Sequence, residues 1–146
     1  MSEADGYAEI DHTADLGLRV WADTLEGLFH QAARGLADLL TDPATVVPRV
    51  ERVFELRAID LEELLVAWLN EILYAWESED LLLAAIREMS IRRVGDGFAL
   101  RARAAGETRD PARHPVGEPV KAATYHGLRI VPRADGRYEV TLIFDM

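Results

Sequence analysis

Residues 60–76 limit most narrowly what this chain can fold into, because their apolar side chains repeat with the period of an α-helix. The apolar residues on that face are Leu61, Leu64, Leu65, Trp68, Leu69, Ile72, Leu73 and Trp76. Asp60, followed three residues later by Glu63, has the capping-box pattern that starts a helix. A face this wide must be buried against another element. We therefore expect a helix whose two tryptophans are core residues, with Asn70 on its solvated side.

A second helix is predicted within residues 23–40, where the same period recurs. Its apolar face consists of Leu25, Leu28, Phe29, Ala32, Leu36, Leu39 and Leu40. Asp23 is predicted to be the N-cap, because Glu26 follows three residues later. His30 falls on the polar side of this helix and is predicted to be a surface residue.

Most of the remaining chain alternates apolar and polar residues, which is typical of β-strands. The predicted strands cover residues 7–10, 16–22, 50–59, 88–94, 98–105, 120–131 and 138–144. The sequences "GDG" (95–97) and "ADGR" (134–137) predict tight hairpin turns. Residues 106–119, "GETRDPARHPVGEP", are rich in Gly and Pro and too polar to be buried, so we expect an exposed loop.

The order of these elements predicts an α+β fold: a sandwich in which two amphipathic helices pack on one face of a mostly antiparallel β-sheet. A length of 146 residues fits a single domain, residues 1–146. No apolar run approaches the ~20 residues needed to span a membrane. The acidic start of the chain does not resemble a secretory signal, and the chain has no cysteine, so we expect a cytoplasmic protein.

The charge balance argues against a stand-alone nucleic-acid binder. Sixteen Lys and Arg residues stand against 26 Asp and Glu, which gives a net charge of −10. Nucleic-acid binding draws most of its affinity from cations that neutralise phosphates. The balance instead favours a basic protein partner or a metal cation.

The familiar catalytic motifs are absent from the sequence. No glycine-rich phosphate loop, GxSxG or HExxH is present, and none of the three serines lies beside a histidine. Four stretches remain as candidates: "DHTAD" (11–15), "DPARH" (110–114), "VKAATYH" (120–126) and the terminal "DM". On the residues alone each also has a structural explanation. Asp11 and Asp15 would cap a turn, Asp110 would open one, Lys121 would point outward from a strand, and Asp145 would be an exposed end.

Taken together, these stretches resemble the archease family. The similarity extends over "YAEIDHTADLGLRVWADTLEGLFHQAARGLADLL", "LLVAWLNEILY", "GETRDPARHPVGEPVKAATYHGLRI" and the ending "FDM". Archeases are small acidic proteins that assist the tRNA-splicing RNA ligase. The resemblance implies a non-catalytic cofactor that promotes guanylylation of the ligase and its multiple turnover, with the ligase as partner.

The resemblance also implies the functional residues. Asp15, Asp145 and the terminal carboxylate of Met146 correspond to metal ligands, and Lys121 corresponds to the family's functionally important lysine. Family members usually end in Asp-Ile, so Met146 differs in its side chain but keeps the main-chain carboxylate. Three carboxylates without nitrogen or sulfur suit Ca²⁺, the expected ion, or Mg²⁺ or Mn²⁺, rather than zinc.

Other residues of the "DHTAD" motif are assigned less directly. Some relatives have Glu at the position of Asp11, which makes Asp11 the weaker ligand candidate. His12 and Thr13 are expected to hold the turn. For one ion to bind Asp15 and Asp145, the terminal strand should run beside the first strand, so that both aspartates meet at one edge of the sheet.

Two rival functions remain open. A metal-dependent hydrolase would use Asp11, Asp15 and Asp145 around a water-activating ion, with His12 or His126 as the available base. A chaperone-like scaffold would use its acids only for solubility, and replacing Asp15 would then leave its function intact.

Overall fold

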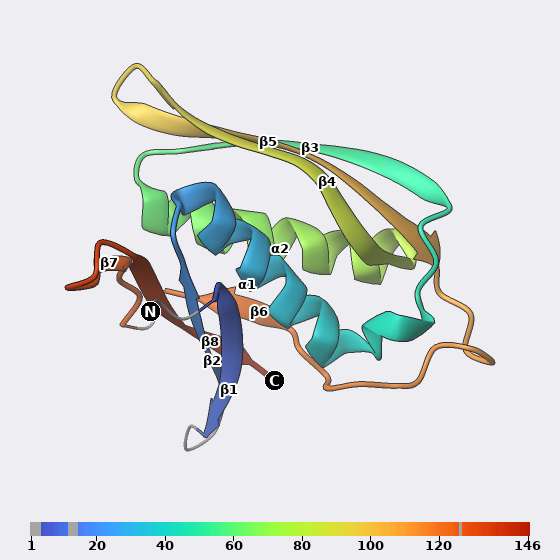
Figure 1. Ribbon diagram of the computed structural model, residues 1–146. Coiled ribbons are helices and arrows are strands. Elements are labelled where there is room, and N and C mark those ends of the chain that lie inside the picture. The colour runs from blue at the N-terminus through green and yellow to red at the C-terminus, as the bar shows by residue number, and fades with distance from the viewer. Residues whose placement is uncertain (1–3, 12–14, 126) are drawn as a thin grey trace.

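The computed structural model describes residues 4–11, 15–125 and 127–146, and it arranges them in three layers (Figure 1). Two helices lie between two antiparallel sheets. The helices are α1 (Leu25–Leu40) and α2 (Leu61–Glu79), and a short 3-10 helix covers Pro43–Thr45. The upper sheet in Figure 1 contains β3 (Val50–Ala58), β4 (Leu81–Val94) and β5 (Gly97–Thr108). The lower sheet contains β1 (Gly6–Asp11), β2 (Leu16–Ala22), β6 (Ala122–Thr124), β7 (Val131–Pro132) and β8 (Tyr138–Asp145).

The predicted α+β sandwich is confirmed, with two helices and antiparallel pairing throughout the described strands. The structure adds that the strands form two sheets, in the orders β1-β2-β8-β6 and β3-β5-β4, with β7 also paired to β8. Each helix contacts both sheets: α1 packs on β2 and β4, and α2 packs on β3 and β6. The apolar faces of the helices are therefore covered from two sides.

The core is centred on Trp68, as the sequence predicts. Its side chain is fully buried, its Nε1 donates a hydrogen bond to the Phe29 carbonyl at 3.1 Å, and its ring meets the ring of Phe54 edge-on at 5.1 Å. This arrangement satisfies the indole N–H inside the apolar layer, as a buried tryptophan requires. Trp76 is only partly buried and packs against the core.

The helix starts agree with the sequence at one helix and differ by one residue at the other. Asp60 caps α2 as predicted, accepting a hydrogen bond from the Glu63 N–H at 2.8 Å. The α1 cap is Thr24, not Asp23: the Thr24 hydroxyl accepts from the Gly27 N–H at 2.9 Å. Asp23 instead forms an ion pair with Arg137. Among the described residues, neither helix is long and apolar enough to cross a membrane.

The two predicted turns are confirmed at their glycines, but the predictions for β4 and for residues 120–131 were wrong in their bounds. Gly95 and Gly136, in the two predicted turns, have φ values of 58° and 84°, which favour glycine. β4 begins at Leu81, seven residues before the predicted start, because two register shifts between residues 83 and 88 hide the period of two. The predicted strand over 120–131 divides into β6 and β7, and both pair with β8.

The segment predicted as an exposed loop, residues 106–119, contains a buried charged cluster. β5 continues through Thr108, and the side chains of Glu107 and His114 are only 4% and 3% exposed. The Asp110 N–H donates to His114 Nδ1 at 2.8 Å, which leaves the Nε2–H of His114 to donate to Glu107 at 2.9 Å. The Glu107 carboxylate also accepts from the Val47 N–H at 3.0 Å, from Arg49 Nε at 3.0 Å and from Arg113.

These donors stabilise the ionised form of Glu107. The hydrogen bond from the Val47 backbone and the contact with Arg113 lower its pKa from 4.5 to about 2, although burial acts in the opposite direction. Glu107 thus ties the loop at residues 110–114 to the segment before β3. The predicted exposure holds for residues 111–113 and 115–119, but Glu107 and His114 are buried because their polar groups satisfy one another.

We expect Glu107→Gln to lower the melting temperature at pH 7, because the neutral amide loses its ionic contacts with Arg49 and Arg113. The pKa of Glu107 is depressed in the folded state, so its contribution is present above about pH 4.5 and is lost as the pH falls toward about 2. Thermal melts at pH 7, 4.5 and 2 should therefore show the difference between wild type and variant shrinking with acidity. Glu55→Gln, at an exposed ion pair with Arg101, serves as the control and should change little. A difference that is constant across this range would contradict the assignment.

Candidate functional site

The predicted site residues lie at the end of β8, the strand inside the lower sheet. β2 pairs with β8 so that Leu16 is opposite Phe144. Asp15 directly precedes Leu16, and Asp145 directly follows Phe144. Because the strands are antiparallel, the two aspartates lie at the same edge of the sheet. The terminal strand therefore runs beside β2 and not, as the sequence suggested, beside the first strand.

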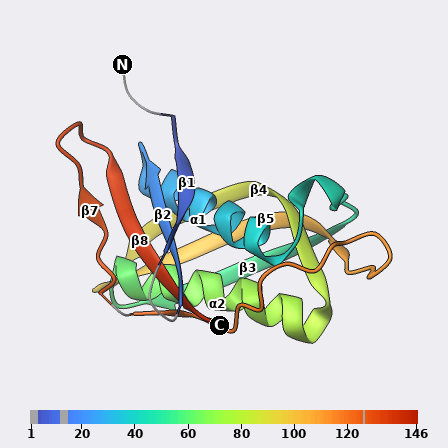
Figure 2. The same ribbon diagram turned by 90° about the horizontal axis from the view of Figure 1, so that it is seen from below.

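Lys121 lies at the same edge, on the other side of β8. β6 pairs with β8 in a register that sets Ala122 opposite Asp145. The Lys121 N–H donates to the Asp145 carbonyl at 2.8 Å, and the Lys121 side chain is exposed. Lys121 is also the only lysine in the chain, beside 15 arginines. Figure 2 shows the C-terminus at the point where β8 ends next to this segment.

Asn70 holds the strand that follows Lys121, a role that the sequence analysis missed. Its side chain accepts from the Ala123 N–H at 2.8 Å and donates to the Ala123 carbonyl at 3.3 Å. The side-chain amide of α2 thus takes the place of a neighbouring strand for β6. Asn70 was expected to be solvated, but it is half-buried at this contact. The only feature of the sequence that could have indicated this role is the position of Asn70 next to the apolar face of the helix.

Met146 and Asp11 are the remaining predicted residues that the structure describes. Met146 is half-buried and packs against the core, which leaves the end of the chain beside Asp145. Asp11 is the last residue of β1, where it pairs with Leu16. His12, Thr13 and His126 lie outside the described residues. The role of His12 and Thr13 in the turn therefore stays a prediction.

Binding of one ion by Asp15 and Asp145 also stays a prediction. Within the described ranges, no three His, Asp or Glu side chains gather as they would around a metal ion. The predicted set is smaller than that, since it uses two aspartate side chains and one main-chain carboxylate. Its donors are all hard oxygens, and the register brings their strand ends together, so the residues fit a hard divalent cation.

A recess of about 310 Å³ opens beside Lys121. Its walls come from the end of α2, at Trp76 and Glu77, and from the chain between Arg109 and Lys121. Arg109 stacks over the ring of Trp76 at 4.7 Å. The loop is held in place by the N–H groups of Gly117 and Glu118, which donate to carbonyls at the end of α1. The chain leading to Lys121 is therefore fixed at several points.

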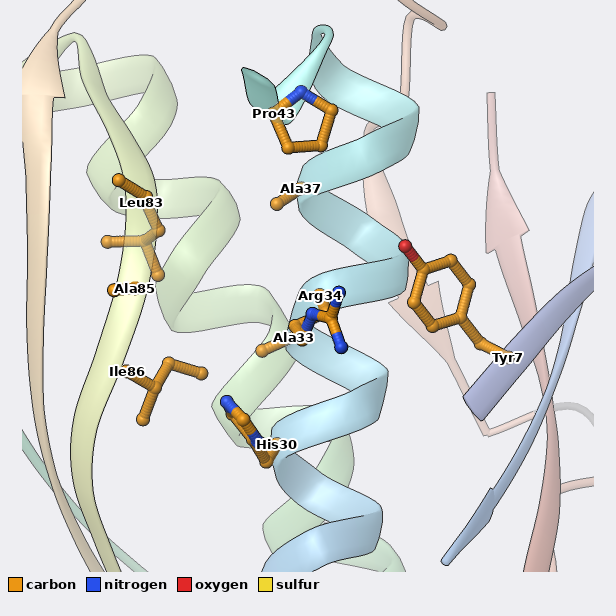
Figure 3. Close-up of a pocket in the computed structure, with 10 residues that line it drawn as sticks. Tyr7, His30, Ala33, Arg34, Ala37, Pro43, Leu83, Ala85 and Ile86 are labelled. Atoms are coloured by element: carbon orange, nitrogen blue, oxygen red, sulfur yellow. The ribbon is translucent and has the colours of Figure 1, made fainter. Parts of the chain in front are cut away.

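A second cavity, of about 300 Å³, lies between α1 and β4 (Figure 3). His30, Arg34 and Tyr7 supply its polar groups, and Ala33, Ala37 and Ala85 leave the space open. His30 was predicted to be a surface residue, but it is half-buried here. Burial, with the nearby charge of Arg34, lowers the pKa of His30. This cavity is lined by none of the predicted site residues.

Comparison with known proteins gives one consistent family. Residues 7–146 match the archease protein family. The chain is 41% identical over 140 residues to protein archease of Methanopyrus kandleri, covering 96% of this chain and 99% of that protein. It is 39% identical to protein archease of Thermococcus gammatolerans, covering 96% and 98%.

A solved structure agrees with the sequence matches. The solution structure of Methanobacterium thermoautotrophicum protein 1598 superposes with a TM-score of 0.82 at 30% identity, covering 97% of this chain and 99% of that one. Similarity of sequence and of fold therefore extends over nearly the whole chain. The chain belongs to the archease family.

Proposed function

We propose that this protein is a non-catalytic cofactor of the tRNA-splicing RNA ligase, which promotes guanylylation of the ligase and allows its repeated turnover. Membership of the archease family supports this proposal. The observation that carries it is the register of β2, β8 and β6, which brings the ends of these strands to one edge with Asp15, Asp145 and Lys121. These are the three side chains that the family resemblance implies.

The proposed ion is a divalent cation, Ca²⁺ in the first place, with Mg²⁺ or Mn²⁺ as alternatives. Asp15, Asp145 and the terminal carboxylate of Met146 would hold it, because all three supply hard oxygen donors. Such an ion supplies a positive charge that attracts phosphate or carboxylate oxygens of a partner. Lys121, on the strand segment next to Asp145, would bind an anionic group beside it through its compact ammonium.

Docking on the ligase is favoured by charge. With a net charge of −10, this chain is steered toward an enzyme whose surface is basic because it binds RNA. The recess beside Lys121 gives such a partner a concave surface to contact. Docking at this edge would bring Lys121 and the carboxylates close to the ligase active site.

The function itself can be tested with purified ligase at limiting concentration. Adding this protein should raise guanylate transfer from GTP to the ligase and increase the number of RNA ends joined per ligase molecule. The isolated protein should neither join nor hydrolyse RNA. Release of product by the isolated protein would favour the hydrolase alternative, and unchanged turnover at every ratio would refute the proposal.

The metal site can be tested without any ligase. An ion that binds only the folded state stabilises it by about 2.7 kcal/mol at 100 times its Kd, or roughly 5–10 °C in melting temperature for a chain of this size. We expect Ca²⁺ to produce such a rise, and Asp15→Ala or Asp145→Ala to abolish it. Asp42→Ala, at the cap of the 3-10 helix, is the control and should keep the rise.

Extending the chain past Met146 with a short tag gives an independent test of the third ligand. The tag turns the terminal carboxylate into a neutral peptide carbonyl, so the stabilisation by Ca²⁺ should weaken. An equal rise with the tag, or with both aspartates replaced, would show that the ion binds elsewhere.

We expect Lys121→Ala to fold normally and to lose ligase stimulation. Because Lys121 is exposed, replacing it should change the free energy of unfolding by less than about 0.5 kcal/mol. Lys121→Arg should recover only part of the stimulation, because a planar guanidinium does not reproduce a compact ammonium. Arg129→Ala, at an exposed cation between β6 and β7, is the control and should keep full stimulation. Full stimulation by Lys121→Ala would show that Lys121 is an ordinary surface residue.

A further inference from the structure

The strands of the upper sheet carry more arginine than glutamate, although the chain as a whole is acidic. Strands β3, β4 and β5 have seven arginines and four glutamates on their two faces together, and one of these arginines, Arg52, faces the helices, where it pairs with Glu79 of α2. These strands carry a net charge of +3, so the rest of the chain carries a net charge of −13. In Figure 1 this sheet forms the layer on the far side of the helices from β2 and β8. The fold thus separates its charges between layers.

The arginines at one end of the outer face of this sheet are neutralised by glutamates. Arg103 contacts Glu51 at 2.8 Å and Glu88 at 3.0 Å. Arg101, next along β5, contacts Glu55 at 3.3 Å. These are ordinary cross-strand ion pairs, and they account for this end of the face as a solvated surface.

The other end, toward the β4–β5 hairpin, is different. Arg57 and Arg92 both lie opposite Ala99 in the sheet register, one on each side of β5. Both are exposed, and among the described residues neither has an ion pair or a side-chain hydrogen bond. Glu55, which is paired with Arg101, lines the same depression as the two arginines, and Asp96 and Glu63 line a neighbouring depression with Arg57. The two arginines thus carry uncompensated charge.

Arg57, Arg92, Arg101 and Glu55 line a depression of about 360 Å³ that also includes Ala99. Residues opposite each other point to the same face, and so does a residue two positions along the strand. Arg57 and Arg92 are separated by two strand spacings, about 10 Å at the backbone. The methyl group of Ala99, only 7% exposed, fills little of the space between their side chains. Guanidinium groups in this arrangement suit an anion with several oxygens, since each group can donate two parallel hydrogen bonds.

We propose that Arg57 and Arg92 form a binding site for the phosphate groups of single-stranded RNA, with Arg101, which is paired to Glu55, at its border. The charge of the site calls for phosphate oxygens, and the choice of RNA as their source rests on the proposed function. The rows of this face around Ala99 carry Val, Ser, Glu and Arg but no aromatic side chain on which bases would stack. Recognition would therefore involve the backbone and be independent of sequence.

The net charge of −10 does not prevent this contact. The two sheets are separated by a layer of helices, which sets them about 20 Å apart. That exceeds the screening length of about 8 Å at physiological ionic strength, so the acidic edge near Asp15 and Asp145 has little influence on the arginine site. We expect affinity in the range of non-specific binding, roughly 10⁻⁴–10⁻⁶ M.

The test is the binding of a fluorescent 15-nucleotide oligouridylate to the complete protein, measured by anisotropy at several salt concentrations. Two arginine–phosphate contacts predict a slope of log K against log salt of about −1.4, since each contact on a single strand contributes about −0.7. Arg57→Glu/Arg92→Glu should bring the slope close to zero and weaken binding on the order of tenfold at 50 mM salt. Arg34→Glu/Arg129→Glu, on α1 and between β6 and β7, makes the same change in net charge away from this face and should bind as wild type.

Three outcomes would overturn the proposal. They are equal loss of binding in both double variants, no binding by wild type at 50 mM salt, and equally tight binding of a polyglutamate of the same charge. Guanylate transfer to the ligase in the absence of RNA separates this proposal from the proposed function. Arg57→Glu/Arg92→Glu should stimulate that transfer as well as wild type does. Failure of wild type to stimulate it would refute the ligase role and leave the RNA measurement standing.

Discussion

The position of β8 inside its sheet is the constraint on which the candidate site depends. β8 pairs with β2 along one edge and with β6 and β7 along the other, so its backbone is hydrogen-bonded on both sides. Val140, Leu142 and Phe144 of β8 are buried in the core. The end of the chain is therefore an integral part of the fold and not an appended tail. Sliding β8 by one residue would turn these three side chains out of the core, so the register that sets Asp145 near Asp15 is strongly fixed.

Polar contacts, more than hydrophobic ones, position the chain on the other side of β8. Residues 109–121 form no regular helix or strand, yet the segment is held along its length. Glu107 and His114 hold its beginning, carbonyls at the end of α1 hold Gly117 and Glu118, and Asn70 holds the strand that follows. Such hydrogen bonds are strong where water is excluded, and they are costly to break singly. Lys121 is thus presented from a rigid backbone although its own side chain is exposed.

The sequence predicted what depends on local pattern and missed what depends on partners distant in the chain. The helical periods around Trp68 and Phe29 were sufficient to identify both helices, because one face of each had to be apolar. The same pattern is silent on a polar residue that is buried by a partner, and for that reason Asn70 and Glu107 were both expected in solvent. Thr24 displaced Asp23 as a cap because adjacent oxygen acceptors are nearly equivalent in sequence.

At the candidate site, local pattern predicted the strands but not which strands pair with each other. Hydrophobic alternation identified β2 and β8 as strands but gave no means of choosing their neighbours, so the terminal strand was assigned to the wrong partner. The family resemblance supplied the residues, and the register brought their strand ends to one edge. The net charge is a sum over the whole chain. It gives no sign of the local positive charge at Arg57 and Arg92, because acids elsewhere in the chain outnumber the basic residues.

The two proposed contacts, with the ligase and with RNA, would use different layers of the fold. The carboxylate edge and the arginine site belong to different layers, with α1 and α2 between them (Figure 1). A ligase docked on the lower edge would leave Arg57 and Arg92 uncovered, so the two contacts would not compete for one surface. The arginine site would then reach only RNA that extends well beyond the ligase active site. It follows that guanylylation, which involves no RNA, would depend on the lower edge alone, whereas the arginine site would act only on the capture or release of long substrates.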